Sequence, residues 1–281
     1  MIPEKYLLSL IENAYKEDVG NGDHSSLCCI NKSVRGKANL LVKEKGIIAG
    51  VEVARAVCKY YSQNLNLDIY INDGAEINPG DIVFTLEGPQ LDILAAERTI
   101  LNFMQRMSGI ATETSKYVNK LKGYKTKILD TRKTTPGMRL VEKEAVRIGG
   151  GLNHRIGLYD MIMLKDNHID YAGGIEKAIL NAEKYLKEKK LDLKIEIETR
   201  SLEDVKEVLR IGKVNRIMLD NFNIQDTMLA VEMISGRFET ESSGGINYEN
   251  LRDYAECGVD FISVGALTHQ IKSLDLSLKA V

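Results

Sequence analysis

Two carboxylates and a lysine stand where strands are expected to end in the second half of the chain. Lys165, Glu198 and Asp220 each follow a largely apolar run that predicts a buried strand. Carboxylates in such places can hold magnesium, accept hydrogen bonds from sugar hydroxyls or stabilise a developing positive charge. Because parallel strands end at the same edge of a sheet or barrel, the three side chains predict a reaction centre.

Glu196 lies two residues before Glu198 in the same predicted strand. Side chains alternate between the two faces of a strand, so both glutamates are expected on one face. We assign Glu198 to the site because it is nearer the strand end, and Glu196 remains the alternative.

Basic side chains gather in two earlier stretches, DTRKTTPGMR at 130–139 and NHR at 153–155. A guanidinium binds a carboxylate bidentately, whereas a lysine supplies a compact charge. Several of each indicate a ligand with more than one anionic group. Lys143 and Arg147, in contrast, are expected on an ordinary solvated helix face.

Glycines follow the last two predicted strands, in SSGGI at 242–246 and SVGALT at 263–268. Small residues there expose backbone N–H groups where barrels often bind phosphate. Together with the acids and the cations, they indicate a phosphorylated sugar, a carboxylate-bearing partner and a reaction that develops positive charge at carbon.

The elements that must position these residues change character near residue 95. Short strands broken by turns, with a helix over 51–63, are expected before that point. Strand and helix then alternate, and the later repeats recur at about 22 residues, which is typical of a (β/α) barrel of eight strands or fewer. The strands are expected at 126–131, 160–165, 193–198, 215–220, 238–245 and 260–266, with helices at 201–211 and 224–234.

Composition excludes several classes of protein. The 281 residues carry a formal net charge of −2, which gives no general attraction to nucleic acid. No apolar run approaches the roughly 20 residues that span a bilayer, and charged residues interrupt the first twenty. The four cysteines have neither zinc-ligand spacing nor disulfide density, so we expect them reduced. The sequence favours a cytoplasmic protein.

The chain resembles the quinolinate phosphoribosyltransferase family, also called carboxylating nicotinate-nucleotide pyrophosphorylases. The resemblance rests on EDVGNGDHSS, AERTILNFMQRMSGIAT, DTRKTTPGMR, EKEAVRIGGGLNHRIGLYDMIMLKDNHI, IEIET, IMLDNF, SSGGI and GVDFISVGALTH. It implies an N-terminal α/β sandwich domain over 1–100, joined by the C-terminal tail 270–281, and an incomplete TIM-like (β/α) barrel over 101–269. It also implies a homodimer or higher homo-oligomer, with no nucleic-acid or membrane partner.

The implied reaction transfers phosphoribose from phosphoribosyl pyrophosphate to the ring nitrogen of quinolinate. Pyrophosphate and CO2 are lost, and nicotinate mononucleotide is formed for NAD synthesis. The resemblance implies Mg2+ with phosphoribosyl pyrophosphate and no organic cofactor. The implied catalytic residues are Lys133, Lys165, Glu198 and Asp220, the last two also facing the metal.

The implied substrate contacts form a larger set. They comprise residues that bind the quinolinate carboxylates, which form the clamp, residues that bind the phosphates, the ribose-facing acids and an arginine that reaches in from a neighbouring subunit. The residues are Arg98, Arg132, Lys133, Thr134, His154, Arg155, Lys165, Glu198, Asp220, Ser243, Gly244, Gly245, Val264, Gly265 and Ala266. Arg98 read alone favours a helix surface, and only the resemblance places it in the partner's pocket.

Three other interpretations stay open. An aldolase-type barrel could use Lys165 as a Schiff-base nucleophile. A non-catalytic sugar-phosphate sensor would bind without turnover, although the set of acids argues against it. A related transferase of molybdenum metabolism would share the motifs. The kinetic order and the oligomer beyond a dimer are not fixed by the sequence.

Overall fold

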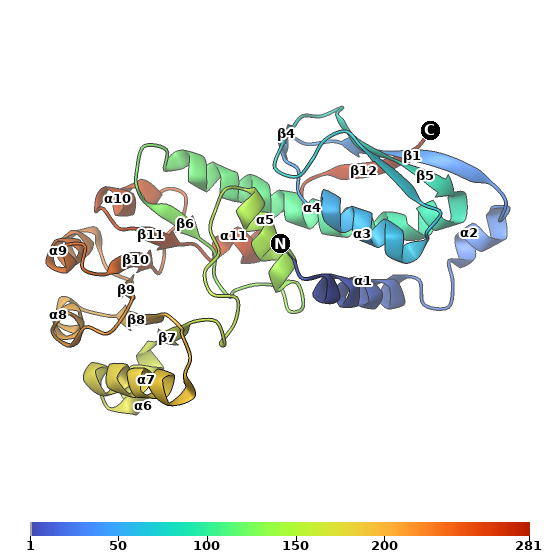
Figure 1. The fold of residues 1–281 in the computed structure, drawn as a ribbon. Coiled ribbons are helices and arrows are strands. Elements are labelled where there is room, and N and C mark those ends of the chain that lie inside the picture. The colour runs from blue at the N-terminus through green and yellow to red at the C-terminus, as the bar shows by residue number, and fades with distance from the viewer. Residues whose placement is uncertain (1) are drawn as a thin grey trace. The chain divides into compact units, whose positions relative to one another are not determined.

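The computed structural model describes residues 2–281, which pack as two compact units (Figure 1). The first unit takes in the chain up to Ser115, then Thr134–Gly150 and Leu267–Val281. The second unit comprises Lys116–Lys133 and Gly151–Ala266. The boundary expected after residue 100 falls inside one continuous helix, α4 (Gln90–Lys120).

The first unit is built on an antiparallel sheet of order β12-β1-β5-β3, in which the C-terminal strand pairs with the first one. Its strands are β1 (Arg35–Val42), β3 (Asn66–Ile69), β5 (Ile82–Pro89) and β12 (Leu276–Ala280), with β2 (Gly46–Ile47) and β4 (Glu76–Ile77) pairing separately. Its helices are α1 (Glu4–Asp18), α2 (His24–Cys29), α3 (Val51–Tyr61), the first part of α4, and α5 (Arg139–Ile148). α11 (Ala266–His269) begins at the last residue of the second unit and continues into the first.

Alternation explains how this sheet forms a core. Ala38, Leu40 and Val42 on β1 are buried while the residues between them are not. Phe84 and Leu86 on β5 are fully buried beside them. Burial of such side chains is worth roughly 1.5–3 kcal/mol each, so a half-apolar strand is held in one register.

The sequence prediction was wrong for Lys143. Its side chain is 1% exposed on α5, where Val141, Glu142, Ala145 and Val146 are also buried. α5 is covered on most of its circumference, so helical periodicity alone misplaces this lysine. Arg147 is exposed as expected, and it pairs with Glu144 at 2.6 Å between Nη2 and Oε1.

The second unit is a six-stranded, all-parallel sheet of order β6-β11-β10-β9-β8-β7 (Figure 1). Its strands are β6 (Lys127–Leu129), β7 (Ile162–Leu164), β8 (Ile195–Thr199), β9 (Arg216–Asp220), β10 (Glu239–Ser243) and β11 (Phe261–Ser263). The helices of this unit are α6 (Asp166–Ala172), α7 (Ile175–Lys189), α8 (Leu202–Ile211), α9 (Ile224–Ile234) and α10 (Leu251–Glu256).

This arrangement confirms an incomplete (β/α) barrel. All six predicted strands are present, and β8, β9, β10 and β11 begin at residues 195, 216, 239 and 261, close to the expected repeat. β6 and β7 are the edges of the sheet, and the structure shows no pairing between them among the described residues. β8 is buried at every position, as a sheet covered on both faces requires.

Side-chain caps fix where the connecting helices start. Ser201 accepts a hydrogen bond from the Asp204 N–H at the start of α8, and Asn223 accepts one from the Asp226 N–H at the start of α9. Each cap is worth about 1 kcal/mol. No helix among the described residues is both long and apolar enough to cross a bilayer.

Candidate active site

The strand-end site is the group Lys165, Glu198 and Asp220, at the carboxyl ends of three neighbouring parallel strands. β8 lies between β7 and β9 in the sheet, so its end is flanked by theirs. Lys165 directly follows β7, Glu198 lies near the end of β8, and Asp220 ends β9. The parallel topology thus brings together residues that are far apart in the sequence, as we expected.

An ion pair joins two members of the strand-end site. Lys165 Nζ lies 2.9 Å from Glu198 Oε1, and the Asp166 N–H donates to Glu198 Oε2 at 3.2 Å. The side chain of Lys165 is 46% exposed and that of Glu198 is 10% exposed. The pair therefore faces outward at the strand ends, where a ligand can reach it.

Asp220 lies close enough to Glu198 for the two charges to interact. Burial raises the pKa of Asp220, the negative charge of Glu198 raises it further, and Lys165 opposes both effects. Asn221 Nδ2 donates to Asp220 Oδ2 at 3.0 Å. Two acids and one lysine leave the site with an excess of negative charge, which suits a cation or a developing carbocation.

The turn after β10 requires glycine because of its backbone conformation and a close neighbouring residue. Gly244 and Gly245 adopt φ values of +90° and +62°, which non-glycine residues rarely take. A Cβ on Gly244 would lie 2.2 Å from Asn221 Oδ1 and 2.9 Å from the Asn221 backbone nitrogen. The turn is thereby held beside the end of β9, next to Asp220. Val264 and Gly265 directly follow the neighbouring strand β11, and Ala266 follows them.

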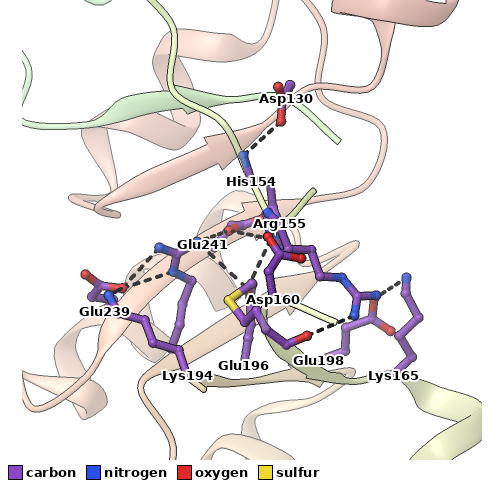
Figure 2. Close-up of polar contacts among 12 residues, drawn as sticks. Asp130, His154, Arg155, Asp160, Lys165, Lys194, Glu196, Glu198, Glu239 and Glu241 are labelled. Carbon is purple, nitrogen blue, oxygen red and sulfur yellow. Dashed lines mark hydrogen bonds and ion pairs between the residues drawn. The ribbon is translucent and has the colours of Figure 1, made fainter. Parts of the chain in front are cut away.

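The cations of the predicted clamp are also partly gathered here. Arg155 is only 8% exposed, and both its burial and the positive charge of Arg132 lower its pKa, in that order. Its Nη1 donates to the Met161 carbonyl at 3.3 Å. Figure 2 shows its side chain extending from His154 toward the Lys165–Glu198 pair. Lys133 is exposed, in the loop after β6, and its N–H donates to Thr131 Oγ1 at 3.1 Å.

Two expected substrate residues belong to the first unit. Arg98 is exposed on α4. Thr134 accepts a hydrogen bond from Arg139 Nε at 3.0 Å. The geometry of the second unit by itself therefore does not include them, and their roles stay predictions.

Below the strand-end site lies a buried ion cluster made of His154, Glu196, Arg216 and Glu241, of which Figure 2 labels the histidine and the two glutamates. His154 Nε2 lies 3.0 Å from Glu196 Oε2 and 3.5 Å from Glu241 Oε2. Arg216 Nη1 lies 2.8 Å from Glu241 Oε2. Both glutamate side chains are 0% exposed. Charges buried this completely persist only when they compensate one another.

The sequence did not identify half of this cluster. Glu196 was the alternative to Glu198, but Glu241 and Arg216 were read as parts of strands. The available signal was alternation, because Glu241 lies two residues before Ser243 as Glu196 lies two before Glu198. Asp130 was also missed: its Oδ1 accepts the His154 N–H at 2.8 Å and its Oδ2 accepts from Asn153 Nδ2 at 2.7 Å.

Two family models cover almost the whole chain. The model described as the N-terminal domain of quinolinate phosphoribosyl transferase matches residues 23–108, and the one described as its C-terminal domain matches residues 110–279. The chain belongs to the quinolinate phosphoribosyl transferase family. The resemblance inferred from the motifs is thus confirmed.

Relatives in this family align along nearly the whole of this chain. A mitochondrial decarboxylating quinolinate phosphoribosyltransferase of Nicotiana glauca is 44% identical over 99% of this chain and 83% of its own. A chloroplastic carboxylating nicotinate-nucleotide pyrophosphorylase of Arabidopsis thaliana is 45% identical over the same shares. The solved nicotinate-nucleotide pyrophosphorylase of Francisella tularensis superposes with a TM-score of 0.94 at 39% identity, covering 100% of this chain and 98% of that one. These similarities decide against the aldolase-type and sensor interpretations.

The strand-end site offers suitable donors for the magnesium ion expected in a phosphoribosyl transferase. Glu198 and Asp220 supply hard carboxylate oxygens from neighbouring strands, and their mutual repulsion would be relieved by a cation. The described residues also bring ligand atoms of His154, Glu196 and Glu241 within 4.8 Å of one another. Both carboxylates of that group are fully buried, so we favour for magnesium the strand-end acids, which a ligand can reach.

Proposed function

We propose that this chain transfers the phosphoribosyl group of phosphoribosyl pyrophosphate to the ring nitrogen of quinolinate. The products are nicotinate mononucleotide, pyrophosphate and CO2, a reaction of NAD biosynthesis. The match of both family domains over residues 23–279 carries this assignment. The acids and cations at one end of the parallel sheet supply the chemistry that the reaction needs.

Quinolinate carries two adjacent carboxylates, and we assign Arg132, Arg155 and Lys165 to them. The charge of Arg132 lowers the pKa of Arg155, so two guanidinium groups repel one another in the protein alone. A dianion placed between them would relieve this repulsion and accept bidentate hydrogen bonds. His154, also expected in the clamp, contacts Arg155 directly.

Glu198 and Asp220 would face the ribose. Departure of pyrophosphate leaves positive charge on the anomeric carbon and ring oxygen, and adjacent carboxylates stabilise that charge in the transition state. Glu198 and Asp220 would also hold magnesium bound with phosphoribosyl pyrophosphate, and the metal would supply positive charge to the leaving pyrophosphate. We assign the phosphates to Lys133, Thr134, Ser243, Gly244, Gly245, Val264, Gly265 and Ala266.

Decarboxylation follows from the first step. Once the ring nitrogen carries the ribosyl group it is a cation, and it can accept electron density from the neighbouring carbon. The bond to the adjacent carboxylate breaks, CO2 leaves, and the electron pair stays on the ring carbon until that carbon takes a proton. No organic cofactor enters this sequence of bonds.

Two finer points are proposals resting on the sequence. We place the enzyme in the cytoplasm. We also propose a homo-oligomer in which Arg98 of one copy completes the quinolinate pocket of another.

The reaction is tested by incubating the protein with magnesium, phosphoribosyl pyrophosphate and quinolinate labelled in the carboxyl group next to the ring nitrogen. We expect nicotinate mononucleotide, pyrophosphate and labelled CO2 in equal amounts. Replacing quinolinate by nicotinate should give no comparable turnover, because the second carboxylate of the clamp has no ligand. Absence of all three products with quinolinate would refute the assignment.

A further inference from the structure

His154 joins the buried ion cluster to the backbone of Arg155, whose side chain extends toward the strand-end site (Figure 2). Its ring nitrogen Nε2 faces Glu196 and Glu241, which come from β8 and β10. Its other ring nitrogen, Nδ1, accepts the backbone N–H of Arg155 at 2.7 Å. The ring thus connects two buried carboxylates to the backbone of the arginine assigned to quinolinate.

Further hydrogen bonds hold the loop on either side of the ring. The His154 N–H donates to Asp130 Oδ1, while Arg155 Nη1 donates to the Met161 carbonyl. Ile156 and Gly157 N–H groups donate to Asp160 at 2.7 and 2.8 Å. Arg155 is therefore fixed at its backbone on both sides, and Figure 2 shows its side chain directed to the strand-end site.

The hydrogen bond to Nδ1 defines where the imidazole proton lies. A backbone N–H can only donate, so Nδ1 must accept and the ring proton must be on Nε2, facing Glu196. Burial alone would lower the pKa of His154, but the two carboxylates raise it to about 9, which favours a second proton. A proton on Nδ1 would break the contact with Arg155, so we favour the neutral ring with its proton on Nε2.

Charge balance explains why the two glutamates are tolerated below the site. Arg216 Nη1 lies 2.8 Å from Glu241 Oε2 and 3.8 Å from Glu196 Oε2, and Arg216 also pairs with Glu239 at 3.1 Å. The guanidinium is only 11% exposed. The arginine offsets part of the carboxylate charge from one side, while His154 Nε2 lies against both carboxylates from the other.

We propose that Glu196 and Glu241 are positioning residues for quinolinate binding, acting through the His154 ring to hold Arg155 in place. The inference rests on the proposed function, since it takes Arg155 as a carboxylate ligand. It gives the buried ion cluster a role in substrate affinity, separate from the chemistry at Glu198 and Asp220.

The test compares two glutamates on the same strand that share one partner. Glu241→Gln removes the charge facing His154, whereas Glu239→Gln removes outer contacts of Arg216 and Lys194. We expect Glu241→Gln to raise the KM for quinolinate roughly tenfold or more and to leave the KM for phosphoribosyl pyrophosphate almost unchanged. Glu239→Gln should leave both constants near those of the wild type. Equal changes from the two variants, or equal changes in both constants, would overturn the proposal.

A double-mutant cycle tests whether the effect passes through Arg155. In an Arg155→Lys background, Glu241→Gln should raise the KM for quinolinate less than about twofold, because the arginine that Glu241 holds in place is already absent. Additive effects would show that Glu241 acts elsewhere and would contradict the proposal.

A measurement on the wild type does not depend on any variant folding or on turnover. In the ligand-free protein, the two 15N shifts of the His154 ring should be far apart, one from a protonated and one from an unprotonated nitrogen. Two similar shifts would mean a doubly protonated ring without the Arg155 contact, which would contradict the proposal. Metal analysis of the purified protein gives a second check. One divalent metal ion per wild-type chain that is lost in Glu241→Gln would also contradict the proposal, because the cluster would then be a metal site. Failure of wild-type turnover would instead refute the proposed function.

Discussion

The strand-end site and the buried ion cluster use the same kinds of residue at two depths of one sheet. Glu198 and Glu196 lie two residues apart on β8, yet one pairs with a half-exposed lysine and the other with a buried histidine. Glu196 has its pKa raised to about 7, first by burial and then by the charge of Glu241. Depth, more than residue type, separates a carboxylate that a substrate can reach from one that holds other side chains.

The two sites also differ in the electrostatic surroundings of their carboxylates. In the buried ion cluster, Arg216 and His154 lie against two carboxylates that are fully buried. At the strand-end site, Asp220 and Glu198 repel one another, and the Asn221 side chain and Lys165 oppose the resulting rise in the pKa of Asp220. Such an unbalanced arrangement favours ligands of opposite charge, which fits catalysis by electrostatic stabilisation.

The largest expected effect tests whether Arg98 of one copy completes the quinolinate pocket of another copy. Arg98→Ala and Lys133→Ala should each be nearly inactive, yet recover roughly a quarter of wild-type activity when unfolded and refolded together. In a mixed dimer one site receives both defects and the other receives neither. Activity is measured as nicotinate mononucleotide formed.

Lys133→Ala mixed with Lys165→Met is the control for that recovery. Both lysines belong to the second unit, so every mixed site keeps one defect and activity should stay low. If the Arg98 mixture gains nothing although mass spectrometry finds mixed dimers, Arg98 does not complete a partner's site.

A smaller effect is expected at Arg155, the link between the two depths. Arg155→Lys replaces a bidentate group by a point charge, so quinolinate binding should weaken by roughly 1.5–3 kcal/mol while phosphoribosyl pyrophosphate binding is kept. Calorimetric titration with each substrate measures both affinities. Arg147→Lys, on the exposed face of α5, is the matched control and should change neither. Equal losses for both substrates would remove Arg155 from the clamp.

The smallest effect is expected at the amino ends of the parallel strands of the second unit. Asp260 precedes β11 and accepts from the Thr240 N–H at 2.9 Å. Burial alone would raise its pKa, but the Thr240 hydrogen bonds and Lys125 lower it overall. Asp260→Asn should therefore lower the thermal unfolding midpoint by about 2 °C at neutral pH, with both KM values unchanged.

The sign of the pH dependence follows from the lowered pKa. The stabilisation by Asp260 is fully present above the unfolded value of 3.8 and is lost as the pH falls through the lower folded value. The difference between wild type and Asp260→Asn should shrink in acid. A difference that grows in acid would contradict the assigned contacts.

The strand-end residues were predictable because apolar runs and alternation determine them locally. Lys165, Glu198 and Asp220 each follow or end such a run, and parallel topology then brings them together. The helix expected over 224–234 matches α9, Ile224–Ile234, because local sequence determines it as well.

The buried ion cluster was not predictable in the same way. His154, Glu196 and Glu241 are separated by more than forty residues at each step, and nothing local marks a charge as buried. Lys143 shows the same limit, since its burial depends on contacts made by the whole of α5. Contacts with residues far away in the sequence determine whether such a charged side chain is buried. A single sequence shows only which face of a strand the side chain is on.

The most direct test of the two-depth account compares Glu196→Gln and Glu198→Gln in one set of kinetic and binding measurements. We predict that Glu198→Gln lowers kcat about a hundredfold or more while the Kd for quinolinate is nearly unchanged. Glu196→Gln should raise the KM and Kd for quinolinate roughly tenfold and leave most of kcat. If the two variants change the same constant, or if their effects are exchanged, the division between a reacting layer and a positioning layer is wrong.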